Sequence, residues 1–403
     1  MRQSSGSPAW CTLADVAGGW SRDEPPEPIE LEARRWLDAI ERETGPLSLF
    51  DVHTHFGRND PDGFRQEPEE LLARMDYAGA RAVFFPMCEP DGYPPANDEA
   101  LAAAETSGGR LVAFCRVDPH DNALAEARRC LDAGARGIKL HPRAERFTMS
   151  EPAVKDLVEL ADERGVPVLI HAGRGIPALG RDTLELARHH PRAHLILAHA
   201  AVSDLAWLWR LMPAHPNLLI DTSWWNPADL MALFCLVPPR QILWASDCPY
   251  GQPISSAALQ LRVALAAGLG REAISSIAGG QIERILAGAE PADAGPPPGA
   301  PGPLDPALER VCSHLLTAMG RAMAGGEVAE SIALARLACD GEGEHASVSG
   351  EVLRLLAIAE RHDGPPPPGR RFPRSIQFLI LALGVARTPD VALPEPTAGR
   401  ESD

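Results

Sequence analysis

Lysine is almost absent from this chain of 403 residues. Of its 38 lysines and arginines only Lys139 and Lys155 are lysines, and 55 acidic residues leave a net charge of −17. Sequence-independent nucleic-acid binding depends on basic side chains that neutralise phosphates. The charge balance therefore argues against a nucleic-acid partner and is typical of an enzyme that acts on small molecules.

Long apolar runs and closely paired cysteines are missing as well. No run reaches the 18 or so apolar residues of a membrane span, and the first twenty residues hold no apolar core of a signal peptide. The eight cysteines include no C-x-x-C pair, and most lie in apolar stretches, so we expect reduced thiols. These features predict a cytoplasmic protein without a membrane partner.

Short apolar runs alternate with amphipathic, Ala-rich stretches between residues 47 and 290. The runs cover residues 47–53, 82–87, 111–117, 137–141, 166–171, 194–199, 217–222 and 241–247. Apolar strands separated by helices indicate a parallel sheet that is buried on both faces. Eight such units predict an α/β protein with a (β/α)8 TIM barrel. A doubly wound open sheet is the competing fold, but no G-x-G-x-x-G follows any of the runs.

The remaining segments surround this predicted barrel. Residues 1–46 form an N-terminal extension with one helix over about 29–44, and residues 291–303 form a Pro/Gly linker. Helical patterns at about 304–323, 328–338, 349–360 and 375–386 predict a small helical appendage over 304–387. Residues 388–403 are expected to be disordered. The appendage could pack on the barrel, contribute to a homodimer or bind a partner.

Two pairs of polar residues end the first and fourth apolar runs. His53 and His55 are two positions apart, so on a strand both imidazoles face the same way. Lys139 and His141 repeat this spacing. The C-terminal ends of barrel strands carry the active site. A metal site at His53 and His55 is therefore predicted, whereas Lys139 could also be a structural cation inside the barrel.

Three further residues end later strands: His171 on the fifth, His199 on the sixth and Asp247 on the eighth. Imidazole and carboxylate groups suit zinc and related divalent ions. Each residue alone could be a core residue with satisfied hydrogen bonds. Their joint position at strand ends favours a shared site.

Five segments carry a resemblance to a known family. They are DVHTHFG (51–57), GIKLHP (137–142), VPVLIHAG (166–173), LILAHA (195–200) and WASDCPYG (244–251). In this order they resemble the amidohydrolase superfamily, and most of all its amidohydrolase-2 branch of metal-dependent hydrolases and decarboxylases. The resemblance implies a TIM barrel and a divalent metal, with Zn²⁺ expected.

The resemblance also implies a role for each site residue. His53 and His55 would bind the first metal, and His171 would be a further ligand. Asp247 would bind the metal and act as general base on the attacking water. His199 would bind a second metal or hydrogen-bond that water. Lys139 matches the lysine that is carboxylated in members with two metals, so one metal and two metals both stay open.

The expected reaction is hydrolysis of a C–N or C–O bond in a small molecule by metal-activated water. Non-oxidative decarboxylation at the same site is the alternative, and an inactive barrel used as a binding scaffold is a further one. His141 would contact the substrate carbonyl. Arginines close to strand ends are candidates for gripping a carboxylate, although each could be a solvated loop residue: Arg58, Arg116, Arg143 and Arg174.

Overall fold

The computed structural model describes residues 26–365 and 372–395. Its strands pair in parallel and form two sheets, with the orders β1-β2-β3 and β4-β5-β6-β7-β8-β9. The strands are β1 Leu49–Phe56, β2 Ala80–Pro86, β3 Leu111–Ala113, β4 Cys115–Arg116, β5 Ile138–Leu140, β6 Pro167–Ile170, β7 His194–Leu197, β8 Leu218–Asp221 and β9 Ile242–Leu243. The predicted third strand, 111–117, is thus divided into β3 and β4.

Backbone hydrogen bonds link the two sheets on both sides. The amide of Phe114, between β3 and β4, donates to the carbonyl of Phe84 in β2 over 3.0 Å. On the other side the amide of Val52 in β1 donates to Trp244, just after β9, over 3.1 Å, and that of His55 donates to Cys248 over 2.7 Å. The strands therefore surround one interior, as in the predicted (β/α)8 barrel.

Alternating side chains along the strands fill that interior. Leu169, Ile196, Leu219 and Leu243 come from four neighbouring strands and belong to one buried cluster, whereas their sequence neighbours face the helices. In β1 the register with β2 shifts between Asp51 and Thr54. Such an irregularity re-aims side chains. It marks the point where the buried apolar residues of β1 give way to the two histidines.

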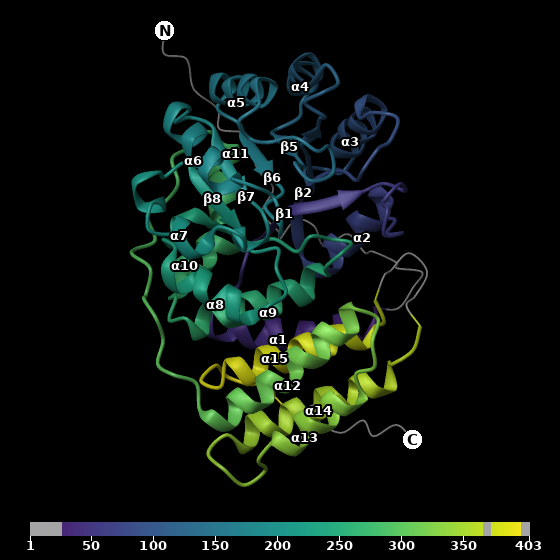
Figure 1. The fold of residues 1–403 in the computed structure, drawn as a ribbon, viewed down its shortest axis with the longest axis vertical. Coiled ribbons are helices and arrows are strands. Elements are labelled where there is room, and N and C mark those ends of the chain that lie inside the picture. Colours follow the sequence, from purple (N-terminus) through teal and green to yellow (C-terminus); the bar gives the residue numbers. More distant parts are fainter. Residues whose placement is uncertain (1–25, 366–371, 396–403) are drawn as a thin grey trace.

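Helices cover the outside of the strands (Figure 1). Those of the barrel region are α2 Pro68–Ala78, α3 Pro94–Thr106, α4 Ala123–Asp132, α5 Pro152–Arg164, α6 Leu179–His189, α7 Leu205–Leu208, α8 Pro227–Leu236, α9 Pro253–Ala266, α10 Arg271–Ser275 and α11 Gln281–Leu286. Between β7 and β8 the chain forms only the single turn α7 and two 3-10 turns, η2 His199–Ala201 and η3 Met212–Ala214. No helix of the described residues is long and apolar enough to cross a membrane.

The remaining helices lie along one side of the barrel. They are α1 Pro28–Thr44, α12 Pro306–Met323, α13 Ala329–Ala338, α14 Ala346–Arg361 and α15 Ser375–Arg387. We call α12–α15 the C-terminal helical unit. Figure 1 shows this unit below the barrel, with α1 and α9 at the junction. Residues 291–305 between the two parts form neither helix nor strand.

The segment after α15 is ordered where disorder was expected from Thr388 onward. Arg262, a buried residue of α9, donates to the hydroxyl and the carbonyl of Thr388 and to the carbonyls of Val391 and Ala392, over 2.7–2.9 Å. A buried guanidinium needs such partners, so it holds this segment in place. Of the expected disordered tail, residues 396–403 lie outside the described part of the chain.

Candidate metal centre

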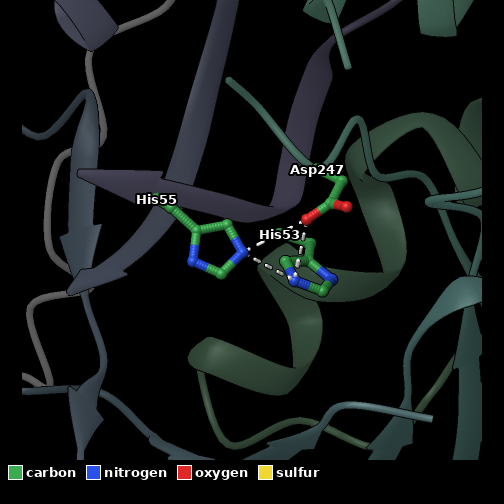
Figure 2. A group of neighbouring side chains, drawn as sticks. All are labelled: His53, His55 and Asp247. Atoms are coloured by element: carbon green, nitrogen blue, oxygen red, sulfur yellow. Dashed lines mark hydrogen bonds and ion pairs between the residues drawn. The ribbon is translucent and has the colours of Figure 1, made fainter. Parts of the chain in front are cut away.

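Three ligand atoms converge at the end of β1. The Nε2 atoms of His53 and His55 lie 3.1 Å apart, and Oδ1 of Asp247 is 3.3 Å from the first and 3.1 Å from the second (Figure 2). Tetrahedral ligands about 2.0–2.1 Å from a zinc ion lie about 3.3 Å from each other. The three donors therefore fit one shared divalent cation.

Asp221, at the end of β8, fixes the tautomer of His53. Its Oδ2 atom lies 2.8 Å from Nδ1 of His53, so Nδ1–H donates and Nε2 keeps its lone pair for a metal. The other oxygen, Oδ1, accepts the backbone amides of His199 and Ser223 over 3.0 and 2.9 Å. This carboxylate orients one of the three converging donors, and in the sequence it appeared only as part of the apolar run 217–222.

The backbone around the site is held in an uncommon conformation. Asp247 has φ 62° and His199 has φ 58°, both in the left-handed region that non-glycine residues rarely adopt. The amide of Asp247 donates to the carbonyl of His53 over 2.9 Å. Buried Asp51 accepts the amides of His53 and Ser246 over 3.1 and 3.0 Å. These bonds tie the two metal-binding segments together.

Neutral imidazoles, the form that binds metal, are favoured at this site. Burial, with the nearby charge of Lys139, lowers the pKa of His53 well below its usual value. Burial likewise lowers the pKa of His55. Fully buried Lys139 lies 3.2 Å from Nε2 of His53, and burial together with Arg116 lowers its pKa to about 7. Burial raises the pKa of Asp247, against the opposing charge of Lys139.

A second histidine group lies next to these donors. His199 Nδ1 is 3.0 Å from the carbonyl of Ser223, which only accepts, so Nδ1 carries the proton. His199 Nε2 then accepts from Nδ1–H of His171 over 2.9 Å. This leaves His171 Nε2 as a lone-pair donor, buried and without a hydrogen-bond partner among the described residues. His141 stacks on His171 at a ring separation of 3.9 Å.

The four candidate arginines are placed differently. Arg143 and Arg174 line a cavity of about 370 Å³ that reaches His171, His199 and Asp247. Arg58 does not line it and pairs instead with Glu67, with its Nε 2.6 Å from Oε1. Arg116 is buried, and its Nη2 binds Glu145 over 2.7 Å. Arg58 and Arg116 therefore bind carboxylates of the protein itself, Glu67 and Glu145, instead of lining the cavity where a substrate contact was expected.

Apart from Asp247, the charged side chains of this cavity are positive. Among the described residues, the charged side chains that line it are Asp247 and three arginines, Arg143, Arg174 and Arg374. The guanidinium of Arg174 lies 5.7 Å from the ring centre of Trp224, in the range of a cation–π contact. The cavity thus combines a site for a cation with groups that attract an anion.

Comparison with known proteins supports a relationship over the barrel. The sequence model of the family described as Amidohydrolase matches residues 50–287. A comparison with curated proteins gives no match. The 5-carboxyvanillate decarboxylase of Sphingomonas paucimobilis is 18% identical, with a TM-score of 0.48 over 60% of this chain and 99% of its own.

Two other solved structures give similar values. A 2,6-dihydroxybenzoate decarboxylase in complex with 2,6-dihydroxybenzoate is 16% identical, with a TM-score of 0.49 over 60% of this chain and all of its own. The 5-carboxyvanillate decarboxylase of Novosphingobium aromaticivorans, in complex with manganese and 4-hydroxy-3-methoxy-5-nitrobenzoic acid, is 14% identical, with a TM-score of 0.46 over 61% of this chain and 98% of its own.

Proposed function

The chain belongs to the amidohydrolase family, and from that premise we propose that it is a metal-dependent hydrolase that cleaves a C–N or C–O bond in a small anionic molecule. The observation that carries the proposal is the convergence of His53 Nε2, His55 Nε2 and Asp247 Oδ1 beside the cavity. Three ligand atoms next to an accessible cavity are typical of a catalytic metal site, which keeps a position open for substrate.

His53, His55 and Asp247 would hold the metal, whereas His171, whose Nδ1 is bound to His199 Nε2, lies outside this group of converging donors. The mixed nitrogen and oxygen donor set favours Zn²⁺. When bound, such an ion polarises the substrate carbonyl and acidifies water. Lys139 lies next to His53, where a carboxylated lysine could support a second ion.

Asp247 would serve as the general base. Its carboxylate borders the cavity, so one oxygen would bind the metal while the other is free to take a proton from the attacking water. The proton taken from the attacking water would then pass to the leaving nitrogen or oxygen. His199 and His171 hold each other in one orientation on the same wall, and Arg143 and Arg174 would bind the anionic group of the substrate.

Decarboxylation is the second candidate because the cavity arginines would bind a carboxylate equally well. The test is to load the purified chain with Zn²⁺ or Mn²⁺, measure bound metal, and screen lactones, amides and aromatic carboxylates in H₂¹⁸O. Hydrolysis incorporates ¹⁸O into the product, and Asp247→Asn should abolish it. Release of CO₂ without ¹⁸O incorporation would establish decarboxylation instead. A chain that binds no divalent metal under any condition would contradict both enzyme functions and favour a binding scaffold.

A further inference from the structure

The cavity beside the metal centre continues beyond the barrel. Its lining includes Leu259 of α9, the three residues 372–374 before α15, and four residues of α15: Ile376, Gln377, Ile380 and Leu381. The family match ends at residue 287, so the residues contributed by α15 lie outside it. One cavity is therefore bounded by both the barrel and the C-terminal helical unit.

The part of this cavity between α9 and α15, which we call the distal subsite, has an apolar wall, beside which α9 contributes the polar residues Ser255, Ser256 and Gln260. Ile376 and Ile380 are one helical turn apart and share a face of α15, and Leu259 and Leu381 complete the apolar wall. Gln377 is the polar residue of α15 in the lining, and its Oε1 is buried without a hydrogen-bond partner among the described residues. An unpaired buried oxygen is unfavourable unless a ligand or water donates to it.

Close packing holds the two helices of the subsite together. A Cβ on Gly384 of α15 would lie 2.4 Å from Cδ1 of Leu259, so the glycine lets α15 approach α9 closely. One turn beyond the wall, Arg262 of α9 binds the segment that follows α15. The two helices therefore hold the walls of the distal subsite in place before any ligand binds, and such preorganisation favours selective binding.

We propose that the distal subsite binds an elongated apolar arm of the substrate, with hydrogen-bonding positions at Gln377 Oε1 and Ser255 Oγ, and that the C-terminal helical unit thereby determines substrate length. The proposal rests on the proposed function for the anionic head of that substrate, which would lie near Arg143 and Arg174. A cavity of about 370 Å³ falls within the usual size range of small-molecule sites, roughly 300–1,000 Å³.

Straight-chain monocarboxylates from acetate to decanoate test this on the full-length, metal-loaded chain by titration calorimetry. We expect Kd to fall about fourfold with each added methylene until the subsite is full, because each methylene leaves water. Ile380→Trp fills the subsite and should remove this gain for the longer chains while leaving acetate binding within about twofold. Ile380→Ala should move the plateau to a longer chain.

Leu334→Trp is the matched control, since Leu334 lies on α13, is 41% exposed and does not line the cavity. Thermal melting verifies that each variant is folded, and Ile380→Ala carries the test if the tryptophan variant is not. A wild-type Kd that does not depend on chain length, or a gain that survives in Ile380→Trp, overturns the subsite. Repeating the series after chelation separates the two proposals. Chain-length dependence that persists in the chelated chain supports the subsite independently of the metal. If the same chain also binds no Zn²⁺ or Mn²⁺ when these are supplied, the proposed function is contradicted and the subsite stands.

Discussion

Replacing Asp221 by asparagine should weaken metal binding without removing any metal ligand. In the structure Oδ1 of Asp221 already accepts two backbone amides, so the oxygen of an asparagine would stay there. Its NH₂ group would then face Nδ1 of His53, where the carboxylate now accepts a hydrogen bond from Nδ1–H over 2.8 Å. Two donors cannot face each other, so His53 would shift its proton to Nε2, the atom that should bind the metal.

The expected size follows from the role of such supporting carboxylates. Losing an outer partner of a metal-binding histidine typically costs 10–100-fold in affinity, or about 1.4–2.8 kcal/mol. The assay is competition for Zn²⁺ between the metal-free chain and a chromophoric chelator at pH 7.5. Asp162→Asn is the control, because Asp162 also accepts a backbone amide, that of Arg192, but is only partly buried and lies on α5. An Asp221→Asn chain with wild-type affinity would refute the tautomer argument.

Three other predictions concern separate parts of the molecule. Lys139→Ala should lower the metal content from two ions to one and abolish most activity if a carbamate bridges two metals; unchanged stoichiometry would contradict the carbamate. Arg174→Gln should raise KM for an anionic substrate by about tenfold with little change in kcat, because it removes a charged hydrogen bond of about 1.5 kcal/mol; an equal loss in kcat would contradict a binding role. Burial alone would raise the pKa of Glu32, but Arg354, 3.1 Å away, lowers this pKa overall. The pair therefore stabilises the fold at pH values above the unfolded pKa of Glu32, about 4.3. This stabilisation is lost as the pH falls through the lower pKa of the folded state. Glu32→Gln should therefore cost about 1–2 kcal/mol in urea unfolding at pH 7 and less below pH 4.3; a cost independent of pH would contradict the ion pair.

The fold could be predicted from the sequence because its signals are local. Buried parallel strands appear as apolar runs, and several helices carry explicit end signals. α2 and α5 begin at Pro68 and Pro152 and end before Gly79 and Gly165, which adopt the left-handed conformation, so the sequence marks both ends of each helix. α8 was harder to identify because it is apolar on all sides and lacks an amphipathic period.

The site could be predicted only in part. His53, His55 and Asp247 have a positional signal, the strand end, whereas Asp221 was read simply as part of the run 217–222. Its acidic side chain in an apolar strand was a usable sign of a buried partner. The pairing of Arg116 with Glu145 joins residues 29 positions apart and depends on packing that no local pattern encodes.

The well-defined structure of residues 388–395, where disorder was expected, also depends on a contact between residues far apart in the sequence. Arg262 is a single charged residue in an otherwise apolar stretch of α9, which indicates a buried partner. Its partner Thr388 lies 126 positions further along the chain. A charge without a local partner can thus be recognised in a sequence, but its partner cannot be located there.

The left-handed backbone at His199 and Asp247 lowers the stability of the fold at the positions that the proposed activity needs. A side chain other than glycine in that region costs on the order of 1 kcal/mol, and the rest of the fold must supply it. Glycine at position 247 would remove that cost together with a metal ligand, so an inactive chain could be the more robust one. Screens that select only for thermal resistance would then favour loss of the metal centre, and stabilising substitutions are better sought away from these two strand ends.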